Sequence, residues 1–366
     1  MKIAYIITRM DQYGGAQIHV RDLSLYARNQ GHEVHILHGM PGKVSAFLQY
    51  EGIACHAIPA LQRAIHPWRD LKSVIQLRRQ LKALAPDIVS CHSSKAGVAG
   101  RLAAARLGMA VIYTAHGWAF TEAVPKTTAR AYRLIEKAAA PLADRIVTVC
   151  DDDRQRGLKA RIAPAGKMIT VHNGMPWLEA PSGAAGDHPG AVRLIMVARF
   201  GPQKDHATLI RALAQVSDLD WQLDLIGGGD EMPIREQVEA FGLTDRIYFR
   251  GEREDVPDWL VLCDIVCLIS NYEGFPRSIL EAMRAAKAVV ASDLAGVGEA
   301  VIDGETGWLV PRGDVDALQA GLRELIADRG CQAQFGTQGR RRYEAYFTLA
   351  HMADQTFGIY AQLAGK

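Results

Sequence analysis

The 366-residue sequence holds only six cysteines, and no two of them form a Cys-x-x-Cys pair. A disulfide framework or a cysteine metal site needs such regular spacing, so the cysteines indicate neither. Most stand inside apolar runs, as Cys267 does in the stretch 264–269, and we expect reduced core residues. The chain also lacks an apolar run near Met1 that is long enough for a signal peptide or a membrane span. We therefore expect a cytoplasmic protein.

Low-complexity tracts and short repeats are absent too. With 49% hydrophobic and 22% charged residues, the sequence has the balance of a folded globular protein, and its length suits two domains. The stretch 173–190 is rich in Pro, Gly, Ala and Ser and has no periodic apolar pattern, which is typical of a linker. We predict a first lobe over 1–175, a second over 176–348, and a C-terminal helical segment over 349–366.

Charge is distributed unevenly along the chain. Up to Met175 there are 24 Lys and Arg against 12 Asp and Glu, which leaves 18 against 28 for the rest. The basic front lobe is expected to face an anionic partner, such as a membrane surface or a phosphorylated substrate, although chance drift in charge would give the same count. No recognised nucleic-acid-binding motif accompanies the charge, so no nucleic acid is expected.

Short β-branched runs alternate with helix-length segments in both halves, which predicts an α/β fold of two doubly wound parallel sheets. Strands are predicted at 3–8, 33–38, 87–91, 110–115, 145–150 and 168–172, and then at 192–198, 221–226, 246–249, 264–269, 288–291 and 308–310. The main helices are predicted at 16–29, 71–84, 95–107, 126–140 and 349–364. In such sheets ligands bind beyond the carboxyl ends of the strands, so sites are expected in strand-to-helix loops.

Two of these loops have residues suited to a phosphate. Gly14 and Gly15 come between the first strand and its helix, where backbone N–H groups can meet an anion, although a tight turn without a ligand explains them equally well. Arg199 and Lys204 follow the first strand of the second half and can converge on a pyrophosphate, whereas the alternative is a solvated ion pair.

A pair of glutamates marks a third loop. Glu273 precedes a helix and Glu281 stands within it, separated by seven residues, so that the two carboxylates can hold two parts of one ligand. Ser278-x-x-Glu281 also fits a capping box, and that alone would account for Ser278 and Glu281. Glu273 has no comparable structural explanation.

Together these segments resemble the family 4 retaining glycosyltransferases, which have the GT-B fold of two Rossmann-like lobes facing a central cleft. The likeness covers nearly the whole chain: Gly14-Gly15-Ala16-Gln17 with His19-Val20, Thr114-Ala115-His116-Gly117, Val171-His172-Asn173-Gly174, Ala198-Arg199-Phe200 with Lys204-Asp205, Glu273-Gly274-Phe275-Pro276 with Leu280-Glu281, and Gly307-Trp308-Leu309-Val310. It also implies that the helix over 349–366 crosses back to the first lobe.

The resemblance assigns roles to single residues. Arg199 and Lys204 would neutralise a donor diphosphate, helped by amides near Gly14 and Gly15, without a metal or any other cofactor. Glu281 would bind the ribose. The remaining assignments are Glu273 with the amides of Gly274 and Phe275 at the donor sugar, Arg277 and Ser278 beside it, Arg253 in the base-binding loop, and His116 near the reaction centre. On local sequence alone, His116 is also explained as a strand-end histidine satisfied by backbone.

The implied reaction is the retaining transfer of a hexosyl group from a UDP- or GDP-linked sugar to a sugar hydroxyl. No Asp-x-Asp motif is present, and Asp151-Asp152-Asp153 are expected to favour the start of a helix rather than to bind metal. The alternatives are a sugar-nucleotide epimerase of the same architecture and a non-catalytic binding subunit.

The acceptor is expected on the basic first lobe. Leu71, Val74, Leu81 and Leu84 can share one face of the helix 71–84, flanked by Trp68 and by Arg69, Lys72, Arg79 and Lys82. This pattern is consistent with peripheral contact at the anionic inner face of the plasma membrane and with a lipid-linked or glycan acceptor. An ordinary surface helix packed on the sheet fits equally well.

Overall fold

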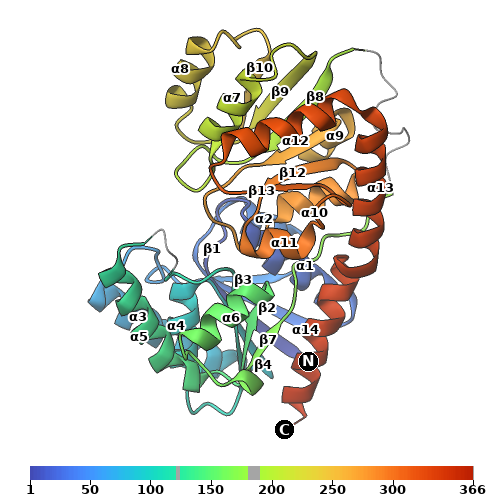
Figure 1. The fold of residues 1–366 in the computed structure, drawn as a ribbon. Helices are drawn as coiled ribbons and strands as arrows, with labels where there is room; N and C mark the ends of the chain where they lie inside the picture. The colour runs from blue at the N-terminus through green and yellow to red at the C-terminus, as the bar shows by residue number, and fades with distance from the viewer. Residues whose placement is uncertain (121–123, 180–189, 366) are drawn as a thin grey trace. The chain divides into compact units, whose positions relative to one another are not determined.

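The computed structural model describes residues 1–120, 124–179 and 190–365. The chain divides into two compact units, Met1–Gly174 with Leu349–Lys366, and Met175–Thr348 (Figure 1). Part of the linker predicted over 173–190 lies outside the described residues. Each unit is an α/β structure with one parallel sheet.

The first unit contains a seven-stranded parallel sheet in the order β3-β2-β1-β4-β5-β6-β7. Its strands are β1 Lys2–Arg9, β2 Glu33–Met40, β3 Ala54–Ala57, β4 Ile88–His92, β5 Ala110–Ala115, β6 Arg145–Thr148 and β7 Met168–Thr170. Its helices are α1 Gly15–Asn29, α2 Lys43–Tyr50, α3 Pro67–Leu84, α4 Ser94–Ala104, α5 Lys126–Ala139, α6 Asp151–Lys159 and α14 Leu349–Ala364, with 3₁₀ turns at Ala140–Leu142 and Ala165–Lys167.

The second unit repeats this plan with a six-stranded parallel sheet in the order β10-β9-β8-β11-β12-β13. Its strands are β8 Val192–Val197, β9 Trp221–Ile226, β10 Ile247–Gly251, β11 Ile265–Leu268, β12 Ala288–Ser292 and β13 Trp308–Val310. Its helices are α7 His206–Ala214, α8 Met232–Ala240, α9 Val256–Leu262, α10 Arg277–Arg284, α11 Ala295–Ala300, α12 Val315–Ala327 and α13 Arg329–Tyr346.

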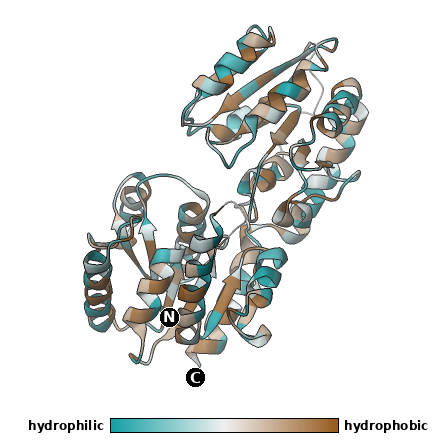
Figure 2. Ribbon diagram, turned by 60° about the vertical axis from the view of Figure 1, so that its left-hand side comes forward, coloured by the Kyte–Doolittle hydropathy of each residue, from teal (hydrophilic) through white to brown (hydrophobic). Residues whose placement is uncertain are grey.

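The sheet of the first unit is covered on both faces. Successive residues of a strand point to opposite faces, so Ala4 and Ile6 of β1 join one buried cluster with α3 and α4, while Tyr5 joins the other. That second cluster includes residues of α1 and the buried Tyr360 of the C-terminal helix α14. Figure 2 shows the strands as mainly hydrophobic, whereas the surrounding helices carry hydrophilic bands. The helix predicted over 349–364 therefore belongs to the first unit's core.

Helix α3 differs from its prediction. It starts at Pro67, with His66 as N-cap, and buries Leu77 and Leu81. Leu71 was predicted to share one face with Leu81, but Leu71 is 54% exposed whereas Leu81 is buried against the sheet, so the two do not lie in the same environment. The structure also contains α2 and the half-exposed four-residue strand β3, neither of which was predicted from their short and weakly periodic segments.

The six cysteines are free thiols, as expected, and four of them are buried.

Candidate functional site

Each sheet has one point at which the strand order reverses direction, between β1 and β4 in the first unit and between β8 and β11 in the second. Loops that leave the carboxyl ends of two such strands diverge to opposite faces, and ligands of open α/β sheets bind in the crevice between them. Gly14 and Gly15 follow β1, and His92 ends β4. Arg199 and Lys204 follow β8, and Glu273 follows β11. The predicted residues Gly14, Gly15, Arg199, Lys204 and Glu273 thus lie at the reversal point of their own unit, whereas Arg253 follows the edge strand β10.

The loop after β8 is held against the glycine turn after β9. A Cβ atom on Gly227 would lie 2.1 Å from the carbonyl oxygen of Ala198, and one on Gly229 would lie 2.3 Å from that of Phe200. Phe200 N donates to Gly228 O at 2.9 Å. The two glycines are therefore needed because the backbones on either side of Arg199 run too close for a side chain.

Lys204 and Glu273 form an ion pair at the second unit's reversal point, with Nζ donating to Oε1 at 2.5 Å. Only 15% of the Lys204 side chain and 7% of the Glu273 side chain are exposed. Gln203 Nε2 adds a longer bond of 3.4 Å to Glu273 Oε2, and an antiparallel bridge joins Lys204 to Ser270. Two residues that are 69 positions apart are in this way fixed side by side.

The other predicted cations of the second unit differ from Lys204. Arg199 is exposed and makes no ion pair with any of the described residues. Arg253 is also exposed, but its guanidinium donates to both carboxylate oxygens of Asp255, at 2.8 and 2.5 Å. The structure thus gives Arg253 a local partner in its loop.

Helix α10 carries the second glutamate. It begins at Arg277 with Pro276 as N-cap and without a side-chain capping hydrogen bond, so the capping-box alternative for Ser278 and Glu281 is wrong. Proline fits here because the first turn does not need its N–H group. Arg277 is buried in the first turn. Phe275 is buried against Phe347, with ring centroids 5.3 Å apart, which fixes the loop in front of the helix.

In the first unit, Gly14 is the N-cap of α1 and Gly15 its first residue. No side chain caps this end of the helix, and a Cβ atom on Gly15 would meet no atom within 4 Å. A helix start whose first N–H groups are not capped by a side chain suits an anionic ligand. The space also means that packing alone does not require glycine at position 15.

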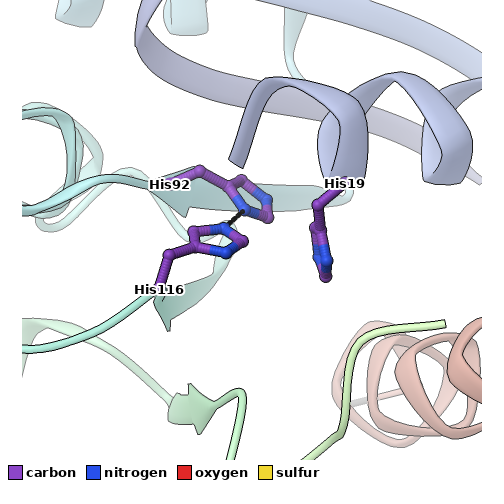
Figure 3. Close-up of side chains that lie close together, drawn as sticks. All are labelled: His19, His92 and His116. Carbon is purple, nitrogen blue, oxygen red and sulfur yellow. Dashed lines mark hydrogen bonds between the residues drawn. The ribbon is translucent and has the colours of Figure 1, made fainter. Parts of the chain in front are cut away.

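His116, which directly follows β5, belongs to a group of three histidines (Figure 3). Its Nε2 lies 3.0 Å from Nδ1 of His92, and its ring is edge-on to that of His19 with centroids 4.7 Å apart. His116 thus has a side-chain partner, whereas the local explanation assumed a backbone one. His19 and His92 were not predicted to contribute to a site.

Further hydrogen bonds anchor the buried members of this group. Asn173 Oδ1 lies 3.0 Å from His19 Nδ1, and since a carbonyl oxygen only accepts, this nitrogen of His19 carries the hydrogen. His92 Nε2 lies 3.0 Å from Ser90 Oγ, which accepts the Tyr360 hydroxyl at 2.9 Å. Burial lowers the pKa of His92 well below its usual value and raises that of Tyr360 to about 12, so both are neutral at pH 7.

Asp151, Asp152 and Asp153 stand in the first turn of α6, where their charge favours the helix start as predicted.

Among the described residues, the only group of histidine, cysteine and carboxylate side chains close enough to hold a metal is the three histidines. Within that same part of the chain, none of the helices combines the length and apolarity required to cross a bilayer.

Comparisons with known proteins agree with this arrangement. The model described as Glycosyltransferase Family 4 matches residues 13–176, and that described as Glycosyl transferases group 1 matches residues 187–342. The chain is similar to the UDP-Gal:alpha-D-GlcNAc-diphosphoundecaprenol alpha-1,3-galactosyltransferase of Escherichia coli, with 26% identity over 90% of this chain and 89% of that protein. It is also similar to the alpha-maltose-1-phosphate synthase of Mycolicibacterium smegmatis, with 29% identity over 96% of both chains.

Solved structures show the same fold. Anabaena HepE in complex with UDP-glucose superposes with a TM-score of 0.83 and 21% identity, covering 99% of this chain and 100% of that one. Sucrose-phosphate synthase from Thermosynechococcus elongatus gives a TM-score of 0.85 and 22% identity, covering 99% and 98%. The two parallel sheets have corresponding strand orders, and the solved structures share this GT-B fold. One family model covers each unit, and the chain belongs to the family 4 glycosyltransferases.

Proposed function

We propose that this glycosyltransferase transfers a hexosyl group with retention of configuration, without a metal, from a UDP- or GDP-linked sugar to a sugar hydroxyl. The observation that carries the proposal is the Lys204–Glu273 ion pair at the reversal point of the second sheet, together with the exposed Arg199 in the same loop as Lys204. A sugar diphosphate has an anionic part and a hydroxylated part. A cation binds the diphosphate, and a neighbouring carboxylate accepts hydrogen bonds from the sugar hydroxyls.

The donor is assigned mainly to the second unit. Arg199 and Lys204 bind the diphosphate, while Glu273 turns to the sugar hydroxyls beside the amides of Gly274 and Phe275. Glu281 takes the ribose. The contacts given to the remaining residues are Arg277 and Ser278 near the sugar, Arg253 near the base, and the amides of Gly14 and Gly15 at the diphosphate. His116 is assigned to the reaction centre.

The reaction proceeds on one face of the sugar. The bond between the anomeric carbon and the phosphate oxygen breaks while the bond to the acceptor oxygen forms on the same side. The leaving phosphate oxygen takes the proton of the acceptor hydroxyl, so no separate base is required. Arg199 and Lys204 stabilise the negative charge that develops on the diphosphate, and preorganised charge of this kind commonly supplies the largest part of enzymatic rate acceleration.

The acceptor is a glycan or a lipid-linked sugar. The Escherichia coli relative acts, by its name, on a diphosphoundecaprenol-linked sugar. In this chain α3 exposes Trp68, Leu71 and Ile75, at 78, 54 and 60% of their surface, next to the exposed Lys72 and Arg79. Apolar and basic side chains on the exposed side of one helix suit contact with an anionic bilayer, and this supports our proposal that the enzyme works at the inner face of the plasma membrane.

A panel of UDP- and GDP-linked sugars tests the donor, because a ligand that binds the folded state raises the apparent melting temperature. The stabilising donor is then incubated with lipid-linked and glycan acceptors, and the anomeric configuration of the product is read by NMR. A donor that is converted to its epimer without any acceptor would identify a sugar-nucleotide epimerase instead. Stabilisation without any turnover would identify a binding subunit.

A further inference from the structure

His19, His92 and His116 come from three separate elements of the first unit and meet at its reversal point (Figure 3). His19 lies in α1, His92 ends β4, and His116 follows β5. Each offers one ligand nitrogen, and these three atoms all lie within 4.8 Å of one another. The ring centroids are 4.7, 5.3 and 5.4 Å apart. The donor contacts proposed for the second unit do not require three histidines of the first unit to lie so close together.

The spacing fits three ligands of one ion. With metal–nitrogen bonds of about 2.0–2.1 Å in a tetrahedron, ligand nitrogens lie about 3.4 Å apart. His92 Nδ1 and His116 Nε2 are already 3.0 Å apart, so a small opening of this pair admits the metal in place of the hydrogen that they share. Three neutral imidazoles suit zinc, copper, nickel or iron rather than the hard cations magnesium and calcium.

The surroundings supply what metal-binding histidines need from their other ring nitrogen. Asn173 Oδ1 accepts from His19 Nδ1, which leaves the lone pair on Nε2. Ser90 Oγ stands 3.0 Å from His92 Nε2 and accepts that hydrogen when Nδ1 binds the ion. Oxygen partners of this kind fix the tautomer and orientation of histidines in metal sites. His19 and His92 are buried while His116 is half-exposed, which leaves a side for entry and for a water ligand.

The geometry points to a transition-metal site of the zinc class formed by His19, His92 and His116, whose occupation inhibits glycosyl transfer. Inhibition follows because the metal would hold the His116 nitrogen and add two positive charges at the residue assigned to the reaction centre. This second half rests on the proposed function, whereas metal binding itself does not. The site is distinct from the diphosphate site of the second unit, for which we propose no metal.

The test uses the full-length protein without an affinity tag, freed of metal by a chelator. Co²⁺ is titrated while the visible ligand-field bands of four-coordinate cobalt are recorded, and Zn²⁺ is titrated by calorimetry. We expect saturation at one ion per chain. His92→Asn and His19→Gln should both abolish the cobalt bands, and Asn173→Ala should weaken binding about 10–100-fold through loss of the orienting bond.

His35→Gln is the matched control, because His35 and His56 form a two-histidine pair elsewhere in the unit, 3.1 Å apart, and this variant should bind as the wild type does. Far-ultraviolet circular dichroism confirms that each variant is folded. Absence of a saturable ion in the wild type, or unchanged cobalt bands in both histidine variants, overturns the site.

The inhibitory role is tested with the metal-free enzyme. Zn²⁺ at one equivalent should lower the transfer rate, and a chelator should restore it. A rate that stays constant or rises with bound zinc overturns inhibition while leaving the site in place. A wild-type enzyme that binds no cobalt but still transfers sugar counts against the site alone, whereas a metal-free wild-type enzyme that transfers no sugar counts against the proposed function alone.

Discussion

Replacing Lys204 by alanine separates catalysis from folding. Lys204 donates to Glu273 at 2.5 Å and is assigned to the donor diphosphate. One well-placed donor to a developing anion is worth roughly 3 kcal/mol, which corresponds to a loss in kcat on the order of 100-fold. The loss should appear at saturating donor, because the charge on the diphosphate grows in the transition state.

The cost to stability is smaller. An exposed ion pair contributes 0–1 kcal/mol, and a fully buried pair that loses one partner costs 3–5 kcal/mol, so about 1–2 kcal/mol is expected for side chains that are only 15% and 7% exposed. Gln203 continues to donate to Glu273 after the substitution, which limits this cost. Denaturant unfolding gives the free energy of unfolding, and initial rates over a range of donor concentrations give kcat and KM.

Arg323→Ala is the control, because it removes an ion pair with Asp218 in the same unit, on α12, without touching the reversal point. It should leave kcat unchanged. The reasoning is refuted if Lys204→Ala keeps a kcat within a few-fold of the wild type at saturating donor, or if its whole loss of activity is accounted for by unfolded protein.

Three further predictions follow from other contacts. Gly227→Ala should destabilise the second unit and abolish donor-induced thermal stabilisation, because the added methyl would lie 2.1 Å from Ala198 O. Burial lowers the pKa of His206 to about 4, so the unfolded chain takes up a proton near its usual pKa of about 6.5 before the folded chain does. The free energy of unfolding should therefore be constant above the unfolded pKa of about 6.5. It should fall by about 3 kcal/mol in total as the pH drops from there to the folded pKa of about 4, as measured by denaturant unfolding. Substituting Lys72 and Arg79 by alanine should weaken binding to anionic vesicles, measured by sedimentation, by about 2 kcal/mol. Each basic side chain near an anionic membrane surface contributes about 1 kcal/mol to the free energy of binding.

Each of these has a matched control. Gly228→Ala should be tolerated, because its added Cβ would lie no closer than 3.6 Å to Glu252. His206→Gln should flatten the pH dependence, and an unchanged slope in this variant would assign the proton to another group. Substituting Arg156 and Lys159 of α6 by alanine removes the same charge from another helix, and equal weakening by both pairs would show that net charge rather than the α3 surface attracts the vesicles.

Much of the fold could be predicted from the sequence because buried parallel strands are continuous apolar runs. The bounds of β5, β9 and β13 were predicted as observed, and the other predicted strands differ by a few residues at most. Strand β3 is half-exposed and only four residues long, so its sequence lacks an apolar run. Helix α2 has eight residues, too few to establish a helical period.

The site could be predicted only in part. Loop chemistry and the family resemblance indicated Arg199, Lys204 and Glu273, but the ion pair depends on the bridge between Lys204 and Ser270, which no local pattern encodes. The histidine group was missed for a similar reason. The register of β4 against β5 pairs His92 with Thr114, two residues before His116, and only a correct strand order reveals that neighbourhood.

The path of the chain has a consequence for how the protein is made. The first unit ends its main segment at Gly174 and is completed by α14, whose Met352, Ile359 and Tyr360 are part of its buried core. On the ribosome, the sheet of the first unit therefore emerges first but acquires helix α14 only after the whole second unit has been synthesised. The second unit, which is inserted between Gly174 and Leu349, has all its strands before α14 is made. Its first and last residues, Met175 and Thr348, are joined by a β-bridge. The part translated second is thus able to mature first, and a chain that stops short of Leu349 leaves part of an apolar sheet face uncovered and open to chaperones and proteases.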